Sequence, residues 1–290
     1  MTIAEQKLCP DCDGPNSDAD LCHAERDADG LPARCVNEWS DEKLFYLRNY
    51  ATIFSKGMKN KWTNRVYLDL FAGPGRYRVK PTGRFEDGSP LIALGLPFTH
   101  LFFCDLSAHV TAALGQRVNK RVHDDQYARV LTGDANGLVQ ELRRQVTNLG
   151  RETLSLAFID PPGTQIRFDS IRMLQDKLPM DLLINFPLGM NINRQHWHRR
   201  AADDDEFDAY FGTPEWRQAK DGRELLVLYK EQLQTLGYRC MDTDLTIRNR
   251  RKNQRLYVLI LASKHPRGDE FWKKATHRDS AGQESLFGHI

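Results

Sequence analysis

The stretch Val66-Tyr-Leu-Asp-Leu-Phe-Ala-Gly-Pro-Gly75 decides the fold of this chain. Its apolar run carries a single acid, Asp69, and ends in Gly73-Pro-Gly75, which predicts a buried parallel strand followed by a tight turn. Glycine lets the backbone approach a ligand closely because it has no Cβ. Asp69 would lie at the carboxyl end of the strand, where open α/β sheets bind ligands. An ordinary strand with a Gly-Pro turn explains these residues equally well when they are taken alone.

Three more apolar runs repeat the pattern and end in an acid: His100–Asp105, Arg129–Asp134 and Ser155–Asp160. Because parallel strands bring their carboxyl ends to one edge of a sheet, four carboxylates would lie along that edge. Asp105 could accept hydrogen bonds from ribose hydroxyls, and Asp134 could accept from an exocyclic adenine amine. One acid-ended strand is common, since Asp often starts a turn. Four in succession favour a nucleoside site on a doubly wound α/β sheet, mainly parallel with one antiparallel strand near its edge.

These motifs resemble those of class I S-adenosylmethionine (SAM)-dependent methyltransferases, with residues 69–75 similar to the family's first motif. The resemblance implies a Rossmann-like fold with a mostly parallel seven-stranded sheet, helices on both faces, and SAM as the cofactor. A departure from the commonest pattern is the insert at 76–88, which could fold over the cofactor or the substrate. The cofactor-binding residues that the resemblance implies are Asp69, Phe71, Ala72, Gly73, Gly75, Asp105, Leu106, Asp134 and Ala135.

Asp160-Pro161-Pro162 resembles the Asp/Asn-Pro-Pro motif of amino methyltransferases, which accepts hydrogen bonds from the target amine and aligns its lone pair with the methyl group. The resemblance implies an enzyme that methylates a nucleobase nitrogen in DNA or RNA, with these three residues as its catalytic motif. An aromatic residue normally follows the two prolines, and this chain has Gly163 there. Phe168 or Trp197 could instead stack on a flipped or single-stranded base.

From about Trp39 onward the chain is similar to the three-Cys-motif partner proteins, a methyltransferase-like group. The similar segments are Trp39-x-x-Glu42-Lys43-Leu44, Gly88-Ser-Pro-Leu91, Ile159-Asp-Pro-Pro-Gly163, Leu256-Tyr-Val-Leu259, Ala262-Ser-Lys-His-Pro266 and Gly282-Gln-Glu-Ser-Leu-Phe287. That family is often encoded beside a cysteine-motif protein that looks like a radical SAM enzyme, so the resemblance implies such a partner. The alternative function is then a non-catalytic SAM-binding or nucleic-acid-binding partner of that protein.

Cysteines cluster near the amino terminus. Cys9-Pro-Asp-Cys12 is a CxxC knuckle, and Cys22 and Cys35 could complete a tetrahedral structural zinc site, with His23 as a rival ligand. Clustered thiols in a reducing compartment favour a metal over disulfides. The second pair is not a CxxC, so unpaired thiols in a loose tail remain the alternative.

Composition suits a soluble globular protein, with 40% hydrophobic and 28% charged residues in a chain of 290. We expect a Cys-rich segment at 1–38, a methyltransferase-like α/β domain at 39–275 and a tail at 276–290. No apolar run is long enough to span a membrane, and an apolar signal core is missing, so we expect a cytoplasmic protein without a membrane partner. The net charge of +2 neither requires nor excludes nucleic acid.

Basic residues gather in two places. The segment between the last two expected strands predicts a hairpin tip that could contact phosphates through Arg248, Arg250, Arg251, Lys252 and Arg255. A sheet edge protected by charge is the alternative explanation. A smaller basic patch, Lys56, Lys59 and Lys61 beside Trp62, is better explained as a solvated helix end.

Overall fold

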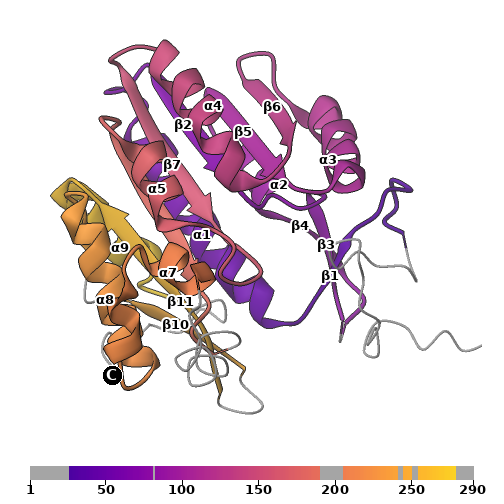
Figure 1. Cartoon of the computed structure of the whole chain (residues 1–290). Helices are drawn as coiled ribbons and strands as arrows, with labels where there is room; N and C mark the ends of the chain where they lie inside the picture. The colour runs from indigo at the N-terminus through magenta and orange to yellow at the C-terminus, as the bar shows by residue number, and fades with distance from the viewer. Residues whose placement is uncertain (1–25, 81, 190–204, 241–243, 250–253, 279–290) are drawn as a thin grey trace, which may run out of the picture.

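The computed structural model describes residues 26–80, 82–189, 205–240, 244–249 and 254–278. One large sheet crosses the molecule, with the strand order β10-β11-β8-β7-β2-β5-β6, and the short β9 pairs with β11 (Figure 1). The parallel strands are β2 (Asn64–Asp69), β5 (His100–Asp105), β6 (Tyr127–Thr132), β7 (Thr153–Ile159) and β8 (Met180–Phe186). The remaining strands are β9 (Arg239–Cys240), β10 (Leu245–Asn249) and β11 (Gln254–Ser263).

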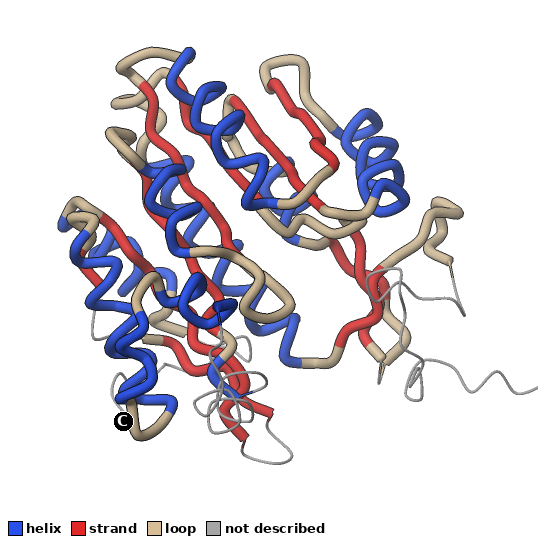
Figure 2. Tube along the Cα trace, viewed as in Figure 1, coloured by secondary structure: helices blue, strands red, loops and turns tan. Residues whose placement is uncertain are grey.

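Helices cover both faces of this sheet, and in Figure 2 they lie in front of and behind the strands. One face packs against α1 (Trp39–Gly57), α2 (Ser89–Leu94), α3 (Ala108–Arg121) and α9 (Pro266–Ala275). The other packs against α4 (Ala135–Asn148), α5 (Phe168–Gln175), α7 (Asp205–Phe211) and α8 (Gly222–Thr235), with the short helix η3 (Pro214–Gln218) beside α7. The central strands are apolar throughout because alternate side chains enter two separate cores: Val66 and Leu68 enter one, and Tyr67 the other.

The predicted seven-stranded, mostly parallel sheet is confirmed in part. Seven strands form one continuous order, but β9 makes the sheet eight-stranded. Strand β11 lies second from the edge and is antiparallel to β8, as expected for one antiparallel strand near an edge. No helix within the described ranges is long and apolar enough to cross a membrane.

The strand order reverses at β2, since the chain adds β5 and β6 on one side of it and later β7 and β8 on the other. Such a reversal leaves a crevice outside the carboxyl ends of the adjoining strands. The motif residues that follow β2 and β7 therefore open onto the same crevice.

The insert at 76–88 forms β3 (Arg76–Val79) and β4 (Phe85–Asp87), and β1 (Arg34–Val36) pairs with β3 in parallel. This small sheet lies beyond the carboxyl ends of the main strands (Figure 1). Cys35 belongs to β1, whereas Cys9, Cys12, Cys22 and His23 lie outside the described residues. Among the residues that the structure describes, no group of His, Cys, Asp and Glu could hold a metal, so the zinc site stays a prediction.

Residues 70–75, between β2 and β3, form a turn that we call the glycine loop. Arg117, in α3, fixes the amino-terminal segment to this loop. Its side chain is 2% exposed, and it donates to the Asp29 carboxylate at 2.7 and 2.9 Å. The same guanidinium donates to the carbonyl oxygens of Pro32, at 2.8 Å, and of Pro74, at 2.6 Å. Bonds between a buried guanidinium and a carboxylate are among the stronger hydrogen bonds in proteins. The segment that leads into β1 is therefore fixed against the loop that follows β2.

Arg117→Ala is expected to lower the free energy of unfolding by about 3 kcal/mol, because it leaves Asp29 and the carbonyls of Leu31, Pro32 and Pro74 without this donor. Hydrogen exchange of residues 26–36 should rise at the same time. The matched control is Arg121→Ala, one helical turn further on, whose exposed guanidinium bonds only to Asp87 among the described residues. Urea unfolding and exchange measurements decide the matter; equal effects of the two substitutions would contradict the anchoring role of Arg117.

Candidate cofactor and active site

A cavity of about 80 Å³ lies at the carboxyl ends of β2 and β7. Its walls come from the glycine loop, from the small sheet and from the first turns of α1 and α2. The polar and charged groups that line it include Arg34, Ser40, Lys43, Arg76, Ser89 and Asp160. The cavity is thus at the place where the reversed strand order leaves a crevice.

The glycine loop is shaped by two different requirements. Gly73 and Gly75 adopt φ values of +63° and +88°, which side-chain-bearing residues rarely adopt. A Cβ on Gly75 would lie 2.9 Å from Leu114 Cδ1, so this glycine is also needed for packing against α3. A Cβ on Gly73 would instead point toward the Arg34 guanidinium, at 3.6 Å, so Gly73 leaves room beside the cavity.

Asp69 ends β2 and is fully buried. Its carboxylate accepts from the Phe71 backbone N–H at 3.3 Å and from the Tyr67 hydroxyl at 3.4 Å. Burial, with the charge of Asp160 adding to it, raises the pKa of Asp69 to about 7. A buried carboxyl in this state is poised to ionise when a cationic group approaches it.

Asp105 ends β5 and braces the same loop. It accepts from the backbone N–H groups of Gly73, at 3.0 Å, and Ser107, at 3.1 Å, and its carboxylate lies 3.7 Å from Arg34 Nη2. The Arg34 Nε is buried and has no hydrogen-bond partner within the described part of the chain. Leu106, the next residue, leaves 73% of its surface exposed. The structure therefore places an unsatisfied donor beside the predicted ribose acid and an apolar side chain next to it.

Asp134 follows β6 and has a structural task of its own. It is exposed and caps α4, where its Oδ1 accepts from the backbone N–H and the side-chain amide of Asn136, at 3.2 and 3.1 Å. Ala135 behind it is buried. The loop after β6 adjoins that after β5, because the Gly133 N–H donates to the carbonyl oxygen of Asp105 at 3.0 Å. Neither Asp134 nor Ala135 lines the cavity.

Asp160 follows β7 and is held by two side chains from other elements. Its Oδ2 accepts from Lys43 Nζ at 2.5 Å, and its Oδ1 accepts from Asn185 Nδ2 at 2.7 Å. Pro161 is buried and Pro162 is exposed. Lys43 was not predicted from the sequence as a site residue, although it lies in the segment Trp39-x-x-Glu42-Lys43-Leu44. Asn185 is a polar residue inside the apolar run of β8, and this pattern could have indicated from the sequence that Asn185 has a polar partner.

One of the two stacking candidates is wrong. Phe168 is fully buried in α5, with its ring centroid 5.9 Å from that of Tyr229, so it offers no face to a base. Trp197 lies outside the described residues. The half-buried ring of Tyr257, on β11, has its centroid 5.6 Å from Lys43 Nζ and is thereby linked to Asp160.

The expected basic hairpin is present in its described part. Arg248 and Arg255 are cross-strand partners in β10 and β11, next to an irregularity between Ile247 and Arg248. Both side chains are half-buried. Arg250, Arg251 and Lys252, which would form the tip, lie outside the described residues, so the phosphate-contact surface stays a prediction.

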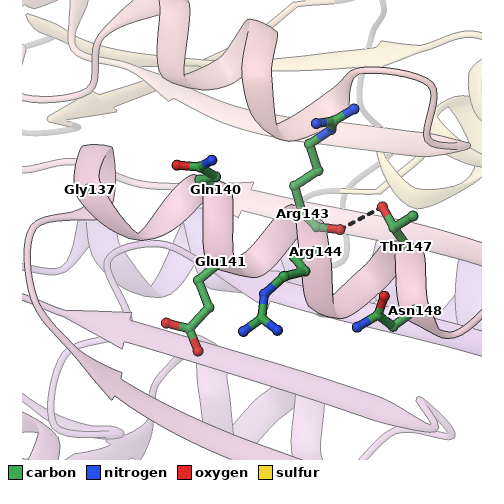
Figure 3. Close-up of a pocket in the computed structure, with 7 residues that line it drawn as sticks. All are labelled: Gly137, Gln140, Glu141, Arg143, Arg144, Thr147 and Asn148. Atoms are coloured by element: carbon green, nitrogen blue, oxygen red, sulfur yellow. Dashed lines mark hydrogen bonds between the residues drawn. The ribbon is translucent and has the colours of Figure 1, made fainter.

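A larger hollow, of about 530 Å³, lies away from these groups. Figure 3 shows that its wall comes from the outer face of α4 alone, with Gly137, Gln140, Glu141, Arg143, Arg144, Thr147 and Asn148. The one bond drawn there, from Thr147 Oγ1 to the carbonyl oxygen of Arg143 at 2.8 Å, is internal to the helix. A hollow with one wall cannot enclose a ligand, and the small cavity at the strand ends is the better candidate.

No protein-family model matches the chain, and a search of the curated proteins finds no match. Several solved structures resemble it at low identity. Protein LPL1258 of Legionella pneumophila, from the family DUF519, is 14% identical with a TM-score of 0.49, over 79% of this chain and 86% of that one. Trm1 of Pyrococcus horikoshii, solved with SAM, is 13% identical with a TM-score of 0.46, over 79% of this chain and 58% of that one.

TYW2 of M. jannaschii, also solved with SAM, is 10% identical with a TM-score of 0.44, over 83% of this chain and 84% of that one. These values identify no family for the chain, and the three-Cys-motif partner resemblance stays a prediction. The functional argument therefore rests on the residues of the site.

Replacement of Asp69 by Asn should change how stability depends on pH. The pKa of Asp69 is about 7 in the folded protein and 3.8 for an ordinary exposed Asp, so folding favours the protonated form. Its contribution to stability is present at acid pH and is lost as pH rises through that window. Since Asn cannot titrate, the stability of Asp69→Asn relative to the parent should increase by about 2–4 kcal/mol from pH ~4 to pH ~8. Urea unfolding across this range tests it, and a pH-independent difference would contradict the prediction.

Proposed function

We propose that the chain is a SAM-dependent methyltransferase that acts on a nucleobase nitrogen in DNA or RNA. The observation that carries this proposal is the convergence of Asp69, Asp105 and Asp160 on one glycine loop, at the point where the strand order reverses. Each acid comes from the end of a different strand, and each has a distinct set of partners. Of the three acids, Asp160 lines the cavity, whereas Asp69 and Asp105 are buried and hold the glycine loop that forms one of its walls.

The residues present fit the cofactor in charge and shape. The buried Nε of Arg34, which lacks a partner within the described ranges, suits the carboxylate of the methionine part of SAM. The carboxyl of Asp69 would suit its ammonium, although Asp69 is fully buried and does not line the cavity, and Gly73 leaves room beside Arg34. A cavity of about 80 Å³ admits only that end of the molecule. Small-molecule sites usually exceed ~300 Å³, so the adenosine part would extend along the exposed Leu106.

Asp105 would take the ribose hydroxyls once the Arg34 side chain turns away from it. The carboxylate oxygens of Asp105 each accept one backbone N–H, and a carboxylate has about four lone-pair directions in all. Room for further donors is therefore available without loss of the bonds that support the loop.

Bound SAM supplies a methyl group that a nitrogen lone pair can attack. In the proposed reaction, Asp160 would orient the target amine by accepting a hydrogen bond from one of its N–H groups, and the carbonyl oxygen of Pro161 would accept a hydrogen bond from the other. Methyl transfer would release S-adenosylhomocysteine, and the methylated amine would lose one proton to solvent. Lys43 and Asn185 fix both oxygens of Asp160 from two directions, so the acceptor is held in place before the substrate arrives. Most of the rate enhancement would then come from positioning.

The nucleic acid would approach from the β10–β11 side, where Tyr257 and the paired Arg248 and Arg255 lie. Phosphate contacts by the hairpin would add affinity that depends on salt rather than on sequence. A radical-SAM-like partner protein and a structural zinc held by the amino-terminal cysteines complete the proposal.

A second candidate is a non-catalytic SAM-binding or nucleic-acid-binding partner protein. The observation that favours it is that Lys43 and Arg34 already neutralise Asp160 and Asp105, while Gly163 stands where an aromatic residue would hold the base. Such a domain would bind the cofactor without using it.

Asp160→Ala should reduce methyl transfer by about 10²-fold or more, because an oriented acceptor is lost, while SAM affinity stays within a few-fold of the parent. The assay is transfer of a radiolabelled methyl group to mixed DNA and RNA, with the protein alone and with its expected partner. Asp169→Ala, on the exposed first turn of α5, is the matched control and should retain parental activity. If the parent binds SAM yet labels nothing, the non-catalytic candidate is favoured for those substrates.

Asp105→Ala should weaken SAM binding by about 2–3 kcal/mol, through loss of a charge-assisted bond and of the brace on Gly73. Calorimetry gives the affinity, and a thermal unfolding curve shows that the variant is folded. Unchanged affinity in a folded variant would mean that the ribose does not lie at the end of β5.

A further inference from the structure

A second cavity, of about 290 Å³, lies at the amino ends of the parallel strands β7 and β8, on the side of the main sheet opposite the candidate active site. It opens between the carboxyl end of α1, the start of α9 and the first residues of β7 and β8, where Leu154, Met180 and Asp181 line it. The candidate active site lies at the carboxyl ends of these parallel strands, and the two cavities share no lining residue. We name this cavity the amino-edge pocket.

The walls of the amino-edge pocket are mainly aromatic and apolar. Phe54 comes from α1, Met58 and Trp62 follow it, and Phe271 comes from α9. Trp62 and Phe271 are half-buried, so the pocket leaves part of both rings accessible. Aromatic faces of this kind suit a flat ring, which gains contact area and stacking at little entropic cost.

A buried acid lies among these apolar walls. Asp181 is about nine-tenths buried, lines the pocket and accepts from the Tyr50 hydroxyl at 2.8 Å. Burial raises the pKa of Asp181 to about 6, so the group is mostly ionised at neutral pH. It can therefore accept a further hydrogen bond from an amine on a bound ring.

Cations from separate segments surround the opening. Lys61 and Arg267 line the pocket, and neither forms an ion pair with another described residue. Lys264 also lines it; its Nζ donates to Gln175 and lies 4.9 Å from the centroid of the Tyr238 ring. Lys61 belongs to the basic patch that the sequence alone explains as a solvated helix end. In the fold, Lys61 lines the same pocket as Lys264 and Arg267, which come from a distant part of the sequence.

A planar ring with an amine, joined to an anionic group, matches these three features. A nucleoside monophosphate combines them in one small molecule. The volume of about 290 Å³ is at the lower limit of small-molecule sites, which suits a mononucleotide better than a dinucleotide. We propose that the amino-edge pocket binds a nucleoside monophosphate, with its base against Trp62 and Phe271, its amine at Asp181 and its phosphate between Lys61 and Arg267.

The experiment titrates the full chain with each of the common ribonucleoside 5′-monophosphates by calorimetry. At least one that carries an exocyclic amine should bind with a Kd below about 1 mM. Arg267→Glu, at a half-buried surface position, should weaken this binding by about tenfold or more, because a phosphate contact becomes a repulsion. The matched control is Lys59→Glu, which makes the same change of charge beside the pocket without lining it, and it should change the affinity less than about threefold.

Three further probes make the test specific. The matching nucleoside and inorganic phosphate should each bind at least about tenfold more weakly than the nucleotide. S-adenosylhomocysteine at saturation should leave nucleotide binding unchanged, since the two cavities are separate. The proposal is overturned if no mononucleotide binds at about 5 mM, if the two charge reversals weaken binding equally, if phosphate or the nucleoside alone binds as well, or if S-adenosylhomocysteine competes.

Discussion

A single buried guanidinium, that of Arg117, joins parts of the chain on which the candidate site depends. It binds Asp29 and three backbone carbonyls, two in the amino-terminal segment and one at Pro74 in the glycine loop. The segment before β1 is thereby fixed to the loop after β2, and Arg34 reaches Asp105 from there. Removal of a buried charge from water is costly unless its donors are satisfied, so this arrangement tolerates little displacement.

Several carboxyl groups lie close together in the site, so its stability depends on which of them are protonated and which are paired with a cation. Burial is the main reason that the pKa of Asp69 is raised, and the nearby charge of Asp160 raises it further. Asp160 is more accessible and takes Lys43 as its partner. One edge of a parallel sheet can therefore present several carboxyl groups, provided that some are neutral and others paired. The same division gives the acids different chemical capacities.

The sequence predicted the central strands well because their apolar runs are short, continuous and closed by acids and glycines. The clustering of the acids was predicted because the carboxyl ends of parallel strands lie at the same edge of a sheet. The small sheet was not predicted, since β1 and β4 have only three residues each and the pairing of β1 with β3 joins residues far apart in sequence. Nor were Lys43 and Arg34 predicted as neighbours of Asp160 and Asp105, because only tertiary folding sets their directions. Phe168 was wrongly predicted to stack on a base, because the sequence pattern of a helix does not show which apolar side chains are buried; Phe168 is fully buried at the start of α5.

The parallel pairing of β1 with β3 also constrains the order of events during synthesis. Asp29 is made early, yet its partner Arg117 follows it by 88 positions in the chain. Strand β1 likewise has nothing to pair with until the insert after the glycine loop exists. Residues 26–36 therefore cannot complete their contacts until α3 has been synthesised, and Asp160, which lines the cavity, is added to the chain later still.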